Sequence, residues 1–132
     1  MTEESLKTLL TEWQKRLRLQ DWGIFVKTAR LAEMQCGGQG ECEWVLKRKE
    51  ATIVLVDPID YPPNMVASQD MEETLVHELL HLHFVILQPK DGTAEDTALE
   101  QAIVCISEAL VKLKREGVSR ESGEIPDKAS CN

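Results

Sequence analysis

The sequence predicts an α+β domain in which one helix precedes a small sheet and two more helices follow it. Apolar residues recur at helical spacing near the N-terminus, in the middle and in the C-terminal half. Between the first two of these stretches lie short runs rich in β-branched and aromatic residues, separated by a glycine-rich turn and a charged turn. A chain of 132 residues forms one domain, which we expect over residues 1–117.

The composition excludes several classes of protein. A formal net charge of −8 argues against nucleic acid or an anionic membrane as a partner. No apolar run reaches the roughly 18 residues of a membrane span. The segment Met1–Ser5 has neither the basic start nor the apolar core of a secretory leader. We therefore expect a cytoplasmic, reducing location, in which the four cysteines are free thiols, and a monomer by default.

The N-terminal helix is expected over residues 3–19, with Thr2 as its N-cap. Its apolar positions recur at helical spacing: Leu6, Leu9, Leu10, Trp13 and Leu17. Three strands follow, over residues 24–31, 42–49 and 52–56, and Asp57-Pro58 stops the last of them. Their short connections favour an antiparallel meander, so the small three-stranded sheet should be mainly antiparallel.

Two helices complete the domain. The first should run over residues 71–87 behind an Asp70 cap, and the second over residues 94–116 behind a Thr93 cap. The short turn between them favours an antiparallel pair. The apolar stripe of the last helix is Leu99, Ala102, Ile103, Ile106, Leu110 and Leu113. Residues 118–132 are polar, and we expect a disordered tail there.

Cys36 and Cys42 flank the glycine-rich turn. Two thiolates do not fill a tetrahedral shell, and their C-x5-C spacing is longer than that of a zinc knuckle. A hairpin tip is therefore favoured over a structural metal site. The glycines are no phosphate loop, because no helix starts after them.

The chemical signal lies in the helix expected over residues 71–87, as His77-Glu78-Leu79-Leu80-His81, an H-E-x-x-H pattern. Residues four apart on a helix lie nearly one above the other, so both imidazoles can face one divalent cation. The Glu78 carboxylate then lies beside a metal-bound water and can take its proton. The alternative is a pair of stray surface histidines. The apolar flanks argue against it, because they predict a buried helix in which unpartnered histidines would be costly.

A third ligand is expected from the following helix. From His81 to the end of its helix the rise is about 9 Å, and the same height back along an antiparallel partner reaches Glu100. Asp96, one turn earlier, is the reserve candidate; the alternative is that Glu100 only borders the exposed face. His83 points about 200° around the helix from His81 and should not reach the same metal.

The H-E-x-x-H pattern with its downstream glutamate resembles the gluzincins, the thermolysin-like zinc metallopeptidases. Over about residues 50–115 the order of elements is similar to minimal single-domain members and to the ImmA/IrrE-type peptidases of mobile elements. The resemblance implies a zincin-like domain with one Zn²⁺ per chain, held by His77, His81 and Glu100, and Glu78 as general base. It implies hydrolysis of a peptide or protein substrate, by an endopeptidase rather than an exopeptidase.

Two features depart from the thermolysin-like pattern. Val104 stands where those enzymes have an aspartate that orients a histidine, and no histidine follows His83. Tyr61 is a candidate for stabilising the oxyanion, the alternative being a loop tyrosine. We expect the substrate to add as a β-strand along Thr52, Ile53, Val54, Leu55 and Val56.

Two rival functions stay open. The first is a catalytically silent binding or regulatory protein that the zinc only stabilises, which the missing aspartate favours. The second is a regulated peptidase that acts on a single partner protein.

Overall fold

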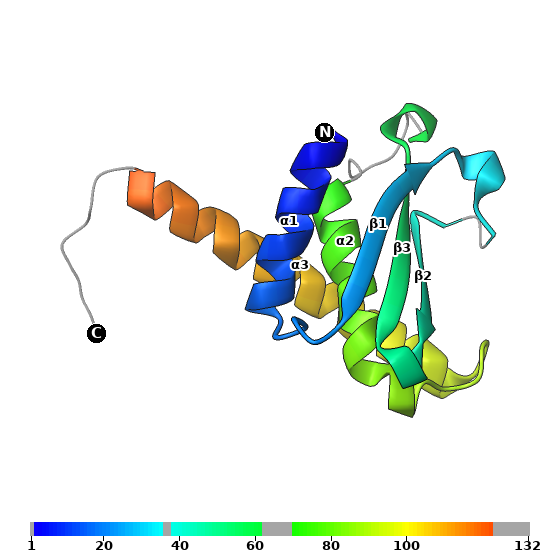
Figure 1. Cartoon of the computed structure of the whole chain (residues 1–132). Coiled ribbons are helices and arrows are strands. Elements are labelled where there is room, and N and C mark those ends of the chain that lie inside the picture. The colour runs from blue at the N-terminus through cyan, green and yellow to red at the C-terminus, as the bar shows by residue number, and fades with distance from the viewer. Residues whose placement is uncertain (1, 36–37, 62–69, 123–132) are drawn as a thin grey trace, which may run out of the picture.

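The computed structural model describes residues 2–35, 38–61 and 70–122, with the backbone alone for residues 118–122. It has the expected α+β order of a helix, three strands and two further helices (Figure 1). None of the described helices combines the length and apolar character needed to cross a membrane. The elements are α1 (Glu3–Arg16), β1 (Gly23–Ala29), β2 (Gly40–Val45), β3 (Glu50–Val56), α2 (Met71–His81) and α3 (Ala94–Ser122).

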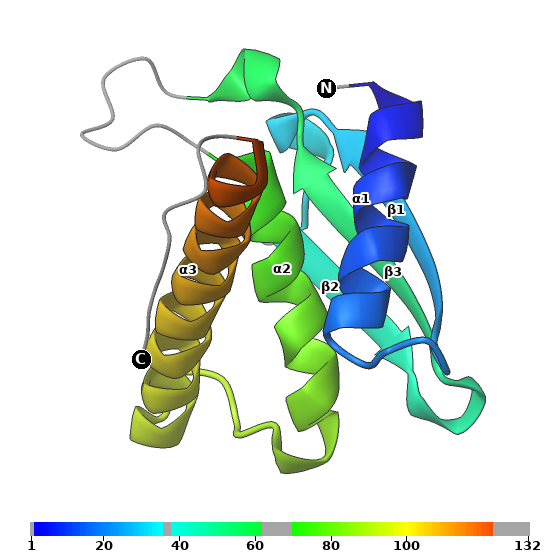
Figure 2. The ribbon, with the colours of Figure 1, turned by 90° about the vertical axis from the view of Figure 1, so that its left-hand side faces the viewer.

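The helices form two layers beside the sheet. Helices α1 and α2 both contact the sheet, and α3 packs on α2 (Figure 2). The sheet is mixed, with the strand order β1-β3-β2. Strand β3 pairs in parallel with β1 and antiparallel with β2. The expected antiparallel meander is therefore wrong for β1, which pairs with β3 instead of β2 and runs parallel to it.

The composition of the strands explains this order. The side chains of Ala51, Ile53, Leu55 and Val56 in β3 are buried, and the other residues of that strand except Glu50 are partly buried. Such a strand is most stable in the middle of a sheet, covered on both edges. Strand β2 has no buried residue and carries two glutamates, which suits an edge strand.

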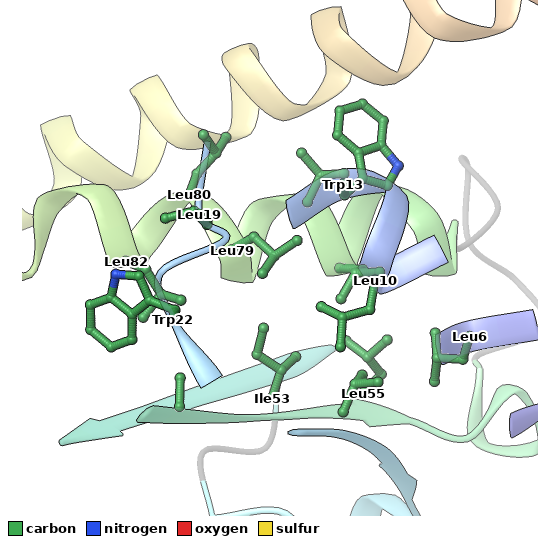
Figure 3. Close-up of a cluster of buried hydrophobic side chains, with 14 of the residues drawn as sticks. Leu6, Leu10, Trp13, Leu19, Trp22, Ile53, Leu55, Leu79, Leu80 and Leu82 are labelled. Carbon is green, nitrogen blue, oxygen red and sulfur yellow. The ribbon is translucent and has the colours of Figure 1, made fainter. Parts of the chain in front are cut away.

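The hydrophobic core lies between the sheet and the first two helices. Figure 3 shows Leu6 and Leu10 of α1 facing Ile53 and Leu55 of β3, with Leu79 of α2 beside them, whereas the ring of Trp13 points away from the strands. The core also contains Leu19, Trp22, Leu75, Val76, Leu80, Leu82, Ile103 and Val111. Because helix α2 contributes residues to the core along its length, the position of its polar face is fixed.

The expected helix caps are confirmed, but the helix ends differ. Thr2, Asp70 and Thr93 each accept a hydrogen bond from the backbone N–H three residues on, at 3.0, 3.1 and 3.2 Å. Helix α1 ends at Arg16, before the left-handed Arg18 (φ 61°). Helix α2 ends at His81 and continues as 3-10 turns over Leu82–Leu87. Helix α3 continues past the expected end near residue 116 to Ser122, and residues 123–132 of the expected tail lie outside the described residues.

The buried side of α3 differs from the expected stripe. Ile103, Ser107 and Val111 are buried, whereas Ile106 is 39% exposed and Leu113 is 63% exposed. The Ser107 hydroxyl donates to the carbonyl of Val104 in its own helix, so its burial leaves no hydroxyl unpaired. The buried side of α3, which contacts α2, is therefore rotated about the helix axis from the apolar stripe expected from the sequence.

A buried carboxylate links all three helices. Trp13 Nε1 of α1 donates to Glu72 Oε2 of α2 at 2.7 Å, and Lys114 of α3 donates to the same oxygen. Arg115 Nη2 donates to Glu72 Oε1 at 3.1 Å and also binds Asp70. Burial raises the pKa of Glu72, but the hydrogen bonds from Lys114 and Trp13 outweigh it, so its pKa lies below the usual value. The ionised carboxylate therefore stabilises this packing.

We predict that Glu72→Gln lowers the free energy of unfolding at neutral pH by about 2 kcal/mol, because the largely buried Lys114 ammonium loses the nearer of its two carboxylate partners. A lowered carboxyl pKa stabilises the fold above the unfolded-state value of about 4, and this stabilisation is lost as the pH falls through the folded-state pKa. The difference in the free energy of unfolding between the wild type and Glu72→Gln should therefore become smaller at acidic pH. Urea unfolding as a function of pH measures it.

The control is Glu50→Gln, which removes an ion pair between the exposed side chains of Arg48 and Glu50. It should change stability little at any pH. Equal effects of the two substitutions, or a Glu72→Gln effect independent of pH, would contradict the role of the buried carboxylate.

Candidate metal centre

Helices α2 and α3 bring two imidazoles and one carboxylate together. His77 and His81 of α2 are one turn apart, with ring centroids 5.2 Å apart. The Glu100 carboxylate of α3 lies against both rings, with Oε1 3.1 Å from His77 Nε2 and Oε2 3.0 Å from His81 Nε2. The three residues expected as ligands from the sequence therefore converge on one point.

This cluster has the dimensions of a metal site. One ligand atom from each of His77, His81 and Glu100 lies within 4.8 Å of the other two. Two ligand atoms bound about 2.0–2.1 Å from one tetrahedral ion lie about 3.3 Å apart. The nitrogen–oxygen distances are close to that value, so the three residues could hold a metal ion with little rearrangement.

The protonation of His81 suits metal binding. Burial lowers its pKa, and the nearby Glu100 carboxylate does not fully offset this effect. A lowered pKa favours the neutral imidazole, the form that binds metal ions.

The other two residues considered for this site lie elsewhere. His83 Nε2 is 2.7 Å from the carbonyl oxygen of Leu17, so this histidine joins the 3-10 turns that follow α2 to the chain just after α1. The Asp96 carboxylate accepts a hydrogen bond from the Gly92 amide at 3.1 Å, in the turn before α3.

Glu78 lies in the same cleft as the cluster. The cleft has a volume of about 700 Å³ and is lined by β2, α2 and α3. Glu78 is 7% exposed. Burial, followed by the negative charges of Glu100 and Glu41, raises the pKa of Glu78 to about 8. A carboxyl group tuned to the neutral range can both take up and release a proton there.

Gly40 of β2 allows the close approach of Glu78 to the sheet. A Cβ atom at Gly40 would lie 2.9 Å from Thr74 Cγ2 and 3.2 Å from Glu78 Oε2. Any larger residue would push strand and helix apart or displace the carboxylate. The sequence showed a glycine-rich turn but not this role, because the role depends on a helix more than thirty residues further along the chain.

Two expected substrate and catalytic elements lie away from the cleft. Strand β3 is paired on both edges, and none of its residues lines the cleft, so a peptide cannot add as a strand to Thr52–Val56. Tyr61 does not line the cleft either; burial and then Asp70, at the start of α2, raise its pKa. The strand that does line the cleft is β2.

Cys42 lines the cleft as a free thiol. Burial, followed by the charges of Glu78 and Glu43, raises its pKa to about 12. The thiol is therefore protonated at neutral pH and is a poor metal ligand in this state. Cys36, its expected neighbour across the turn, lies outside the described residues.

Comparison with family models, curated proteins and solved structures found no match to this chain.

The first prediction here concerns metal content. Purified protein should contain about one divalent ion per chain, and His81→Ala or Glu100→Ala should lower the content because a three-residue site loses a ligand. His83→Ala is the matched control and should keep the metal. Elemental analysis measures all four proteins. Equal metal content in the wild type and both ligand variants would exclude this site.

The second prediction concerns Gly40. We expect Gly40→Ala to destabilise the protein by about 1–3 kcal/mol through overpacking. Adding Thr74→Ser should recover part of the loss, because it removes the methyl group that the new Cβ would meet at 2.9 Å. Gly23→Ala is the control, since its Cβ would meet only Glu50 Cγ at 3.8 Å. Purely additive effects of Gly40→Ala and Thr74→Ser would contradict the proposed contact.

Proposed function

We propose that this protein is a zinc-dependent peptidase. The observation that carries the proposal is the Glu100 carboxylate between His77 and His81, with the Glu78 side chain in the same cleft. Activation of a water molecule by zinc requires two helical histidines, a glutamate from elsewhere in the chain and an adjacent acid. Glu78 follows His77 directly in the chain, so it lies next to the cluster without belonging to it.

Zinc is the metal that suits these donors best. Two imidazole nitrogens and one carboxylate are a frequent set in catalytic zinc sites, which keep a further position open. Magnesium and calcium prefer shells made of oxygen ligands. Bound Zn²⁺ would supply a Lewis acid and lower the pKa of water toward 7.

Glu78 would move the proton in this reaction. Its side chain lines the cleft, and its raised pKa makes it both an acceptor and a donor near neutral pH. It would accept the proton of the attacking water and pass it to the amine that leaves when the peptide bond breaks. The charge of a bound cation would lower this pKa and so favour the accepting form before the reaction.

The substrate would bind along β2 rather than β3. Strand β2 is the edge strand on the side of the cleft and, within the described ranges, pairs only with β3. Its backbone N–H and C=O groups can hold an extended peptide next to Glu78. Such binding uses the peptide backbone, so it accommodates many sequences.

One observation favours the rival in which the metal only stabilises the fold. In the part of the chain that the structure describes, neither His77 nor His81 has a hydrogen-bond partner at Nδ1. Val104, at the place of the aspartate in the thermolysin-like pattern, lines the cleft and cannot serve as one. Catalytic zinc ligands are usually oriented by such a partner. Its absence from the described residues supports a site that binds metal without catalysing a reaction.

We predict that Glu78→Gln keeps its metal and loses peptidase activity by at least about a hundredfold, because glutamine cannot accept the proton. Glu95→Gln, which neutralises an exposed carboxylate of α3 outside the cleft, is the control and should keep activity. Casein and quenched fluorescent peptides, with and without a chelator, give the measurement.

Undiminished cleavage by Glu78→Gln would reject the role of general base. No cleavage of any substrate by zinc-loaded wild type, with stability lost on chelation, would favour the silent rival. Capture of one intact protein by Glu78→Gln would instead indicate a peptidase with a single partner.

A further inference from the structure

The cleft around the metal cluster is strongly acidic. Apart from Glu78 and Glu100, six carboxylate residues from β2, α2, α3 and the turn before α3 line it: Glu41, Glu43, Asp70, Glu73, Asp91 and Glu108. A divalent cation bound to the cluster would neutralise only two of these charges. Any ligand that enters the cleft therefore meets a negative potential.

Basic residues are absent from this lining. The chain has 15 lysines and arginines, and none lines the cleft among the described residues. Arg115 approaches one end, but its guanidinium already binds Asp70 and Glu72. The acidity of the cleft thus exceeds what the net charge of the chain alone would give.

Glu73 of α2 and Glu108 of α3 line the cleft from its two helices. Glu73 lies one turn before His77 on α2, about 6 Å along the axis, and Glu108 lies two turns after Glu100 on α3. Within the described ranges, neither side chain has a hydrogen-bond or ion-pair partner. Burial, then the charges of Asp70 and Glu108, raises the pKa of Glu73 against the opposing effect of the Arg115 charge.

A second observation indicates that a ligand binds in this cleft. The Glu78 side chain is 7% exposed and lines the same cleft. No group of the described residues donates a hydrogen bond to it. Gln88 also lines the cleft, and its buried Oε1 has no hydrogen-bond partner among the described residues, so a ligand in the cleft could supply the missing donor.

We propose that the cleft takes a cationic peptide, with a lysine or arginine side chain between Glu73 and Glu108, beside the peptide bond at the metal cluster. This inference rests on the proposed function, since it names the substrate class of the same site. The ammonium or guanidinium group would complete the pair of carboxylates that the fold leaves without a partner. Glu73 and Glu108 would act as specificity-determining residues, because they touch the substrate away from the bond that breaks.

The test is a binding measurement on zinc-loaded Glu78→Gln protein, which under the proposed function should bind peptides without cleaving them. The probes are three fluorescein-labelled peptides of alternating alanine and lysine, alanine and glutamine, or alanine and glutamate. We expect the lysine peptide to bind at least about tenfold more tightly than the glutamine peptide, and the glutamate peptide to bind most weakly. Added salt should weaken binding of the lysine peptide most.

The matched variants add Glu73→Gln and Glu108→Gln, or Glu3→Gln and Glu4→Gln, to that protein. Both pairs remove two charges, but Glu3 and Glu4 lie on the exposed first turn of α1. The first pair should reduce the preference for lysine to about threefold or less, and the second should leave it unchanged. An equal loss in both would attribute the preference to net charge and overturn the assignment.

The outcomes separate this inference from the proposed function. Equal binding of the three peptides overturns the inference, and their cleavage by wild type would leave the peptidase proposal standing. Tight binding of the lysine peptide without cleavage by wild type would overturn the peptidase proposal and support the ligand class. Absence of both binding and cleavage would overturn both.

Discussion

The contact on which the candidate metal centre depends is the Glu100 carboxylate between the imidazoles of His77 and His81. It joins α2 and α3 through side chains that are 23 residues (His77) and 19 residues (His81) from Glu100 in the chain. Helix geometry lets α2 present both histidines on one face, but only the antiparallel packing of α3 places the carboxylate opposite them. If α3 slid by one turn along α2, Glu100 would move by about 5 Å and the cluster would be lost.

The rest of the fold holds this helix pair in register. At the other end of α2, Glu72 binds Lys114 and Arg115 of α3, and between the two polar contacts the core residue Ile103 is fully buried. Strand β2 approaches α2 at Gly40, which places the sheet edge beside Glu78. The cluster thus lies on rigid elements rather than on loops, as a site that must keep its geometry requires.

Much of this could be predicted from the sequence, because the signals were local. The spacing of His77 and His81 and the rise of two antiparallel helices were enough to select Glu100. The long-range features were not predictable in the same way. The central place of β3 depends on which strands pair, and the role of Gly40 depends on a helix far along the chain. The buried charge of Glu72 was missed because its partners come from two other helices.

In the proposed site a zinc ion would bind to His77, His81 and Glu100. X-ray absorption at the zinc edge of metal-loaded protein tests it most directly, since it identifies the ligand atoms and their distances. The predicted spectrum has a shell of nitrogen and oxygen ligands at about 2.0–2.2 Å with two imidazoles and no sulphur. A sulphur shell near 2.3 Å, which a thiolate such as that of Cys42 would give, or a shell without imidazole would contradict it.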